Sequence, residues 1–432
     1  MLTVAYLANQ FPVAVEPYVS EEIQELRHRG VHVIPGSVRR TLAEPHQSPG
    51  AEGAGEVLCL QPIRMLILLR ALGLILRRWK QVAGLATRAV VRGKESPERR
   101  AKTLLHTCMG AYYAAQLQGR GVDHIHVHHG YFGSWIAMVA ARLLGVGFSL
   151  TLHGSDLLLD GAYLDTKLKN CQFCVTISEY NRRYILQHFP AIDPGKIVVS
   201  RLGADVPARA GFARPRTVGA ARHIFTLLSV GRLHAVKDHA FLIRACARLC
   251  DCGVDFECAI AGEGPERQRL ELLIRQNGMQ DRVTLVGHVA RPQMDFLYQR
   301  ANVVVLTSRS EGIPLVLMEA MVRGRIVLVP AITGIPELVI PGKTGFLYAP
   351  GSIKDFVARI LFLEERIRGE DQNAVSRLDW IRHAARVQVV HNFSRRKNLT
   401  HFGDRFLQRI ASQQFAAQDW SSPHEDLVLQ QI

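Results

Sequence analysis

The feature of this sequence that most constrains its fold is the alternation of short apolar runs with longer amphipathic stretches. The runs are rich in β-branched residues, as buried strands are, and stretches of helical periodicity separate most of them. In the first half of the chain they lie at 2–8, 32–34, 124–128, 149–153, 173–177 and 197–200. Strands that alternate with helices predict a parallel sheet with helices on both faces.

The same pattern begins again in the second half. Five further runs lie at 224–230, 256–261, 283–286, 303–306 and 326–329. A chain of 432 residues suits two domains of about 200 residues each. We therefore expect an α/β protein with two Rossmann-like, doubly wound domains, at 1–205 and 223–375. Ligands bind at the carboxyl ends of the strands in such folds, so we expect the domains to face each other across a ligand cleft.

Three segments lie outside these domains. Residues 206–222 contain prolines, glycines and arginines with little apolar periodicity, which predicts a linker. Residues 376–410 have a helical pattern, and we expect these helices to cross back to the first domain. Residues 411–432 are polar and rich in Gln and Ser, which predicts partial disorder.

The formal net charge of +15 favours an anionic partner, such as a membrane surface, a phosphorylated ligand or nucleic acid. Segment 62–102 contains eleven Lys or Arg residues but only two acidic residues, and Leu and Ile are interleaved with the basic residues. This composition predicts a basic amphipathic helix in a membrane interface; the alternative is that its apolar side belongs to the domain core. Nucleic acid is disfavoured, because the interleaved residues are not stacking aromatics.

The sequence also bears on the compartment. The most apolar window, 65–76, is shorter than the roughly 20 residues that span a bilayer, so no transmembrane helix is expected. Residues 1–8 are interpreted as a strand and not as a signal peptide. The eight cysteines form neither a disulfide framework nor a zinc motif, which favours a reducing compartment. We expect a cytoplasmic protein, peripheral on the inner face of the plasma membrane.

The most informative motif is the pair Glu311 and Glu319, which flanks a predicted helix start after the strand at 303–306. Pro314 is expected in the first turn of that helix, where proline is tolerated. Free amides at a helix start, with the helix dipole, suit an anion such as pyrophosphate. A carboxylate suits the paired hydroxyls of a ribose or a hexose. The alternative is a capping acid followed by a solvated helical Glu.

Two other motifs follow strands of the second domain. Gly231 permits a tight turn, and Arg232 and Lys237 supply two cations that would neutralise a diphosphate. The alternative is a pair of surface charges beside a turn. Gly262 and Gly264 form a G-x-G turn, which is a weak nucleotide signal because the third glycine of the dinucleotide fingerprint is missing.

Together these segments resemble the retaining glycosyltransferases of family 4, which have the two-domain GT-B fold. The matching segments are E-G-x-P-x-x-x-x-E at 311–319, G-R-L and K-D within 231–238, G-x-G-P at 262–265, T-G-I-P-E-L-V at 333–339 and G-K-T-G-F-L at 342–347. The opening F-P-V-A-V-E at 11–16 resembles members that assemble exopolysaccharide, capsule or colanic acid. It departs from their F-P-x-x-S-E-T pattern, with Val15 for the serine and Pro17 for the threonine.

The resemblance implies transfer of a hexose, with retention, from a nucleotide-diphosphate sugar to a glycan or lipid-linked acceptor in surface polysaccharide synthesis. It implies no metal and no other cofactor. The implied catalytic residues are His153, Glu311, Arg232 and Lys237. The implied donor-binding residues are Gly231, Arg232, Lys237, Gly262, Gly264, His288, Glu311, Gly312, Pro314, Leu315, Val316 and Glu319. The implied acceptor-side residues are Glu16, His128 and Asp156.

Histidines supply the last signal. His124, His126 and His128 alternate, so strand geometry places them on one face. A metal site is disfavoured because no matching set of carboxylates is visible nearby. His153 has a competing interpretation as a core histidine beside a turn glycine. Two other functions stay open: a nucleotide-sugar epimerase of the same fold, which needs acid and base groups at the sugar ring, and a non-catalytic basic binding protein. The sequence leaves open the donor sugar, its base, the acceptor, the linkage and the oligomeric state.

Overall fold

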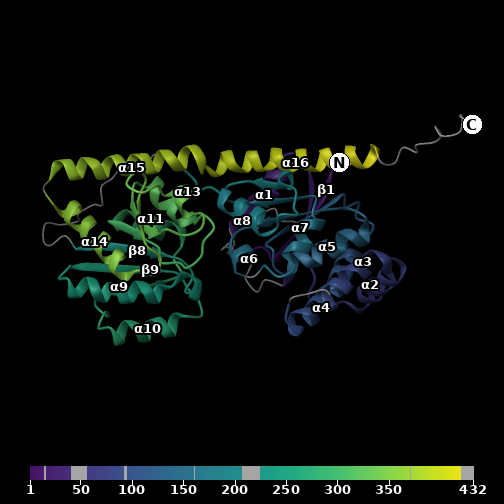
Figure 1. Cartoon of the computed structure of the whole chain (residues 1–432), viewed down its shortest axis with the longest axis horizontal. Coiled ribbons are helices and arrows are strands. Elements are labelled where there is room, and N and C mark those ends of the chain that lie inside the picture. The colour runs from purple at the N-terminus through teal and green to yellow at the C-terminus, as the bar shows by residue number, and fades with distance from the viewer. Residues whose placement is uncertain are drawn as a thin grey trace, which may run out of the picture. The chain divides into compact units, whose positions relative to one another are not determined.

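The computed structural model describes residues 1–13, 16–39, 56–91, 95–159, 161–206, 224–369 and 371–419. They form two compact units. The first unit comprises Met1–Thr176, Ile185–Ser200 and the chain from Leu399; the second comprises Ile177–Tyr184 and Arg201–Asn398. Each unit holds one parallel sheet with helices on both faces (Figure 1). The predicted α/β class with two doubly wound sheets is confirmed. The predicted linker, apart from Val206, lies outside the described residues.

The sheet of the first unit has the strand order β3-β2-β1-β4-β5-β6-β7, and its strand pairs are all parallel. The strands are β1 (Thr3–Gln10), β2 (His32–Arg39), β3 (Leu58–Cys59), β4 (His124–His128), β5 (Gly147–Leu152), β6 (Phe173–Thr176) and β7 (Ile197–Val199). The order reverses its direction between β1 and β4. The carboxyl ends of these two strands therefore flank the point where doubly wound sheets bind ligands.

The sheet of the second unit has the order β10-β9-β8-β11-β12-β13, again with parallel pairs. The strands are β8 (Phe225–Val230), β9 (Phe256–Ala261), β10 (Val283–Gly287), β11 (Val303–Val305), β12 (Ile326–Pro330) and β13 (Phe346–Tyr348). Here the reversal lies between β8 and β11. The sequence analysis did not predict β3 or β13.

Alternation along the strands divides the core of the first unit into two layers. Ile125 and Val127 of β4 are fully buried on the face covered by α5 (Phe132–Leu144). His126 lies on the opposite face, where its ring meets Phe406 of α16 (Arg395–Asp419). The other helices of this part of the chain are α1 (Pro17–His28), α2 (Met65–Arg77), α3 (Trp79–Val90), α4 (Pro97–Leu117), α6 (Ser155–Leu158), α7 (Leu164–Asn170) and α8 (Glu179–His188).

The basic segment 62–102 is not the single helix that its composition predicts. It contains α2, α3 and the first turns of α4. Arg78 ends α2 and begins α3, with φ −119° and ψ 30°, which lie outside the helical region. Two shorter helices therefore take the place of one, and both of them pack on α4.

The second unit has the same layered arrangement. Val303 and Val305 of β11 pack toward α9 (His239–Asp251) and α14 (Ile353–Arg368), whereas Val304 packs toward α12 (Leu315–Val322) and α15 (Gln372–Asn392). The remaining helices are α10 (Arg267–Gln276), α11 (Arg291–Arg300) and α13 (Ile335–Leu338). Helix α16 continues to Asp419, and so enters the segment 411–432 for which the composition predicts partial disorder. Residues 420–432 lie outside the described residues.

Replacement of Phe406 by alanine tests the packing of α16. The Phe406 ring is 1% exposed, and its centroid lies 5.1 Å from that of His126 and 5.5 Å from that of Phe173. We expect Phe406→Ala to lower the free energy of unfolding by about 3–5 kcal/mol in urea titrations. Leu105→Ala is the control, because that side chain is 59% exposed and should change stability by less than about 0.5 kcal/mol. Equal effects of the two substitutions would contradict the packing described.

Candidate active site

Polar side chains gather at the strand-order reversal of each sheet. In the second unit they follow β8 and β11, and in the first unit they follow β1, β4 and β5. The carboxyl ends of parallel strands lie at one edge of a sheet, so residues far apart in sequence meet there.

An ion pair joins the loops after β8 and β11 in the second unit. Lys237 Nζ lies 2.5 Å from Glu311 Oε1, and the side chains are only 20% and 11% exposed. The same carboxylate oxygen accepts a hydrogen bond of 2.6 Å from Ser308 Oγ. An ammonium group has three N–H donors, so the pair holds Lys237 in place and leaves two donors for another ligand.

Glu319 lies on α12, one turn beyond the helix start. Tyr298 Oη donates a hydrogen bond of 3.0 Å to Glu319 Oε2. Burial and the nearby Glu319 charge raise the pKa of Tyr298 well above its ordinary value, so this phenol remains a donor. Pro314 is the N-cap, with the extended angles φ −70° and ψ 126°, and α12 begins at Leu315. The prediction that Pro314 lies in the first turn is therefore wrong by one residue, because its ψ is not helical.

The glycine turns allow two loops to pack backbone against backbone. A Cβ atom at Gly262 would lie 2.0 Å from the carbonyl oxygen of Gly231, and one at Gly264 would lie 2.3 Å from that of Leu233. Gly262 also donates its N–H to the carbonyl of Gly287, at 2.8 Å. The loops after β8, β9 and β10 thus meet at glycines.

The remaining predicted donor residues lie on the same edge of the second sheet. Arg232 is exposed directly after Gly231, and His288 is exposed directly after β10. Gly312 is half-buried in the loop before α12, and Leu315 and Val316 form its half-buried first turn. The structure thus brings the predicted donor residues to the ends of β8, β9, β10 and β11.

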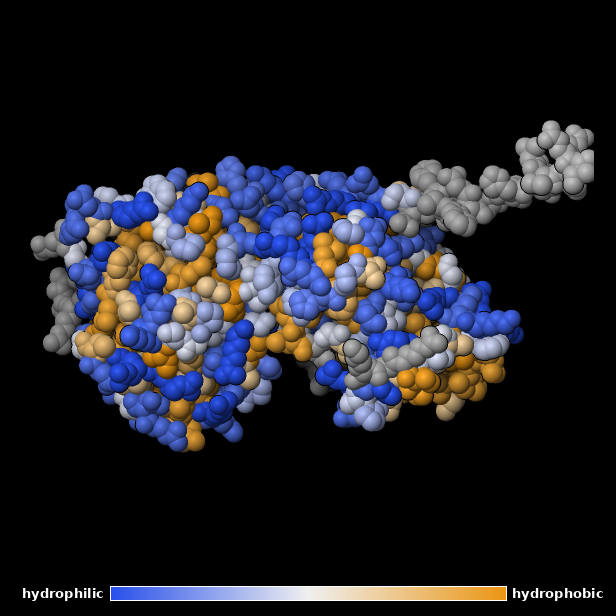
Figure 2. Space-filling view, in the orientation of Figure 1, coloured by the Kyte–Doolittle hydropathy of each residue, from blue (hydrophilic) through white to orange (hydrophobic). Residues whose placement is uncertain are grey.

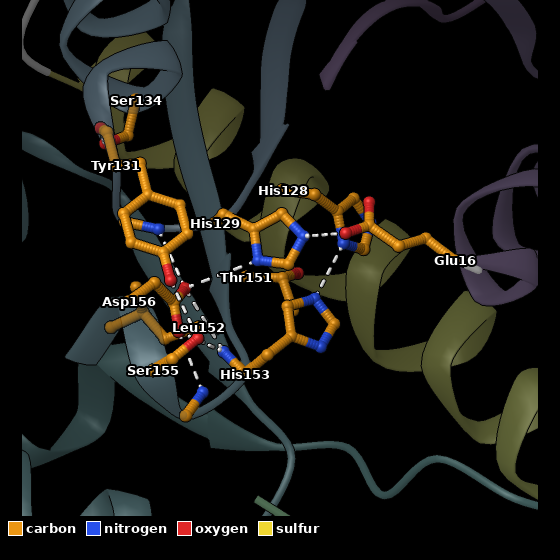
Figure 3. A network of polar contacts seen from close by, with 12 residues as sticks. Glu16, His128, His129, Tyr131, Ser134, Thr151, Leu152, His153, Ser155 and Asp156 are labelled. Atoms are coloured by element: carbon orange, nitrogen blue, oxygen red, sulfur yellow. Dashed lines mark hydrogen bonds and ion pairs between the residues drawn. The ribbon is translucent and has the colours of Figure 1, made fainter. Parts of the chain in front are cut away.

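A charged triad follows the strands of the first unit (Figure 3). His129 Nε2 lies 3.2 Å from Glu16 Oε1, and His129 Nδ1 lies 3.8 Å from Asp156 Oδ2. Burial alone would lower the pKa of His129, but the two carboxylates outweigh burial and raise its pKa to about 10. His129 is therefore an imidazolium at neutral pH.

Asp156 anchors the loops around this triad. Its carboxylate accepts backbone N–H groups from Gly130 at 2.8 Å, His153 at 3.1 Å and Gly154 at 2.8 Å. Burial would raise the pKa of this carboxyl, but the His129 contact and the Gly154 amide overcome burial and hold the pKa well below its usual range. Asp156 is fully buried, so it shapes the site through these amides.

A second chain of contacts begins at His153. His153 Nε2 lies 2.9 Å from His128 Nδ1, and His128 Nε2 lies 2.9 Å from Glu22 Oε2. Tyr6 Oη donates to the same Glu22 oxygen. Burial, together with the neighbouring His129 and His128, lowers the pKa of His153 well below its ordinary value. His153 is thus neutral and half-buried at the accessible end of this chain.

Glu22 also corrects an expectation. The ligand atoms of Glu22, His126 and His128 lie within 4.8 Å of one another, so a carboxylate does accompany these histidines. Sequence reasoning missed it because Glu22 lies on α1, far from β4 in the chain. His126 already has partners on both ring nitrogens, Ser149 Oγ at 2.7 Å and Thr151 Oγ1 at 3.0 Å. A metal ion would have to displace these bonds.

Sequence reasoning also missed His129. Its signal was its position directly after β4, next to the strand-order reversal, where polar residues of a doubly wound sheet meet ligands. The alternating histidine pattern of β4 ends at His128, so that pattern does not include His129. The three histidines of β4 do share one face: His124 and His126 both bond to Ser149 and contact Phe406, and the ring of Tyr6 contacts both His126 and His128.

Two family models match this chain. Residues 15–206 match the model described as Glycosyltransferase Family 4, and residues 220–377 match the model described as Glycosyl transferases group 1. The chain belongs to the family 4 glycosyltransferases. The predicted family and its GT-B fold are thereby confirmed.

Relatives and solved structures agree with this family. Over 205 residues the chain is 33% identical to the putative colanic acid biosynthesis glycosyltransferase WcaL of Escherichia coli. The matched residues make up 46% of this chain and 48% of WcaL. The chain thus spans about half the length of the curated relatives it matches. The fold is shared with sucrose-phosphate synthase of Thermosynechococcus elongatus, at a TM-score of 0.70 and 17% identity over 95% of this chain and 100% of that structure. It is also shared with Anabaena HepE in complex with UDP and glucose, at a TM-score of 0.64 and 17% identity over 94% of this chain and 100% of that structure.

The charged state of His129 predicts how stability depends on pH. Its pKa of about 10 in the folded protein exceeds the ordinary value of about 6.5. The stabilisation is therefore complete below pH 6.5 and is lost as the pH rises toward 10. In urea titrations we expect the wild type to lose up to about 1.4 kcal/mol more per pH unit than His129→Gln between pH 7 and 10.

His32→Gln is the control for this comparison, because His32 is exposed at the start of β2. It should keep the wild-type dependence on pH. Parallel stability curves for the wild type and His129→Gln would show that His129 is not a buried cation.

Proposed function

We propose that the protein is a retaining glycosyltransferase that moves a hexose from a nucleotide-diphosphate sugar to a glycan or lipid-linked acceptor in surface polysaccharide synthesis. The observation that carries the proposal is the Lys237–Glu311 ion pair at the strand-order reversal of the second sheet, with Glu319 one helix turn further on. The relatives support it: WcaL bears the description of a colanic acid glycosyltransferase, and HepE was solved with UDP and glucose.

The second unit would bind the donor. Lys237 and Arg232, with the first-turn amides of α12, would balance the negative charge that develops on the departing diphosphate. Glu319 would accept hydrogen bonds from the ribose hydroxyls while Tyr298 keeps its carboxylate in place. Glu311 Oε1 is occupied by Lys237 and Ser308, and Oε2 accepts no hydrogen bond from the described residues, so Oε2 would bind the hexose.

The backbone near Gly287 and His288 would flank the base of the nucleotide. The leaving group is already a diphosphate, so its departure needs charge stabilisation more than it needs protonation by an acid. The arrangement uses no metal ion, since the cations and amides supply the compensating charge. The first unit would supply the acceptor side, with Glu16 and Asp156 holding His129, and with His153 beside the transferred sugar.

Nucleotide release from UDP- and GDP-sugars tests the donor site. We expect Lys237→Met to lower kcat roughly 10²–10³-fold, because one charge on the leaving group loses its partner. Glu319→Gln should raise the donor KM at least tenfold, and its amide oxygen can still accept from Tyr298, which preserves the fold. A membrane extract serves as the acceptor source.

Glu271→Gln is the control, because Glu271 is 40% exposed on α10 and its partner is Arg267. Unchanged release in both test variants would sink the donor-site assignment. Product NMR separates the alternative, since an epimerase would convert the donor sugar without an acceptor.

We further propose that the protein works on the inner face of the plasma membrane and docks there through α2. Met65, Leu69, Leu72 and Leu76 are spaced by four, three and four residues, which places them on one helix face. They are 68%, 58%, 47% and 76% exposed. The opposite face of α2 packs on α4. Figure 2 shows hydrophobic residues gathered over the place of α2 and α3.

The charges around this face favour an anionic lipid surface. Arg70 and Arg77 lie along one edge of the apolar stripe, and neither has an acidic partner among the described residues. No Asp or Glu occurs between Glu56 and Glu95. A second copy of the same face would bring like charges together, whereas anionic headgroups attract each nearby cation by about 1 kcal/mol. The occupant that fits both features is therefore a lipid surface.

The length of α2 suits a helix that lies in the interface. Its 13 residues measure about 20 Å, less than the apolar core of a bilayer. Among the described residues, the helices all fall short of the length or the apolar character that a membrane-spanning helix needs.

Cosedimentation with phospholipid vesicles tests the docking surface. We expect binding to phosphatidylglycerol vesicles and little binding to phosphatidylcholine vesicles at the same ionic strength. Leu69→Glu with Leu76→Glu, and separately Arg70→Glu with Arg77→Glu, should each weaken binding at least tenfold. Leu272→Glu is the control, since Leu272 is 49% exposed on α10. Vesicle binding that none of these changes weakens, or a dimer that the leucine variant dissociates, would refute the proposal.

A further inference from the structure

An arginine ends helix α12 one turn beyond Glu319. Arg323 follows Glu319 by four residues, and a glutamate attracts a cation at this spacing along a helix. Within the part of the chain that the structure describes, no ion pair joins these two side chains, and the Glu319 carboxylate accepts a hydrogen bond only from Tyr298. A cation close by in the sequence thus leaves this carboxylate unpaired.

The guanidinium group of Arg323 is engaged elsewhere. Its Nε donates to Asp295 Oδ1 at 2.9 Å, and its Nη2 donates to the same oxygen. Its Nη1 donates to the backbone carbonyl of Glu319, also at 2.9 Å. Its central carbon lies 5.0 Å from the centroid of the Tyr298 ring. Each nitrogen of the guanidinium therefore has a partner other than the Glu319 carboxylate.

Helix α11 supplies the partners of both side chains. Asp295 and Tyr298 are three residues apart on this helix, a spacing that makes their side chains neighbours. Tyr298 is 1% exposed, so its ring is fixed in the core, whereas the Asp295 side chain is 51% exposed at the surface. Helix α11 thus offers a hydrogen-bond donor to Glu319 and a carboxylate to Arg323.

This division of partners decides what Glu319 can bind. A guanidinium group pairs with a carboxylate through two parallel N–H donors, which would occupy both oxygens of Glu319. The donors of a guanidinium lie in one plane, so Arg323 cannot direct the same fork at Asp295 and at Glu319 together. While Asp295 holds Arg323, Tyr298 occupies Glu319 Oε2 and leaves Oε1 as an open acceptor.

We propose that Asp295 is a positioning residue that holds Arg323 away from the Glu319 carboxylate, so that this carboxylate stays open to the hydroxyl groups of the donor's ribose. The ribose partner rests on the proposed function, whereas the hold on Arg323 does not. Asp295 contacts no substrate in this role, and it acts through the cation that it removes from competition.

The crystal structure of Asp295→Ala tests the hold on Arg323 without any substrate. Asp295 lies half exposed on α11, and alanine is the best helix former, so we expect the variant to fold. In the variant the Arg323 guanidinium should lie within about 4 Å of a Glu319 carboxylate oxygen. An Arg323 side chain that stays away from Glu319 in the variant would overturn the proposal.

Calorimetric titration with UDP and with GDP tests the consequence for the ligand. For the nucleotide that the wild type binds, we expect Asp295→Ala to raise Kd at least about threefold, since Arg323 then competes for Glu319. The loss should be smaller with the 2′-deoxy form of that nucleotide, which has one ribose hydroxyl fewer.

A second substitution separates competition from a structural role. Asp295→Ala combined with Arg323→Met should restore the wild-type Kd, because the competing cation is gone while an unbranched side chain remains. A structural role of the Asp295–Arg323 pair predicts the opposite, since the double variant lacks both partners. A double variant that binds the nucleotide as weakly as Asp295→Ala would therefore contradict the proposal.

Asp251→Ala is the matched control. Asp251 accepts from Arg248 at 3.1 Å on α9, in an exposed ion pair of the same kind, and its loss should leave Kd unchanged. With an accepted donor, Asp295→Ala should raise the donor KM at least about threefold and keep kcat within about twofold. If the wild type binds neither UDP nor GDP, the proposed function fails, while the crystal structure still decides whether Asp295 holds Arg323.

Discussion

Parallel pairing of strands is the constraint on which the rest of this structure depends. In both sheets the described strands run in one direction, so their carboxyl ends share an edge. The strand order reverses between β1 and β4 in one sheet and between β8 and β11 in the other. At each reversal the two flanking loops leave in opposite directions, which opens a space at that edge. Lys237 and Glu311, 74 residues apart, meet there, as do Glu16 and His129.

The first unit separates charge among adjacent histidines. His129 is held as a cation by two carboxylates, and that cation disfavours charge on His153. His126, deeper on the same face, bonds to hydroxyl groups of β5, and its burial lowers its pKa far below the ordinary value. Neighbouring rings of one residue type thus have different protonation states because their hydrogen-bonding partners differ.

The sequence was sufficient for the fold class, since the long strands carry unbroken apolar runs and the helices between them are amphipathic. It also placed Glu311 and Lys237 near strand ends, because each follows a recognisable apolar run by only six or seven residues. It could not locate Glu22, because the contact with His128 joins α1 to β4 across 106 residues. It could not decide whether the apolar side of segment 62–102 is core, since burial depends on which face α4 covers.

The backbone contact between the glycine turns has a consequence for engineering. The carbonyl of Gly231 occupies the space that a side chain at Gly262 would need, and the carbonyl of Leu233 does so for Gly264. Neither loop can be diversified at these positions by itself. A chimera that takes the loop after β9 from a relative must therefore take the loop after β8 with it, and the two loops are best grafted as one cassette.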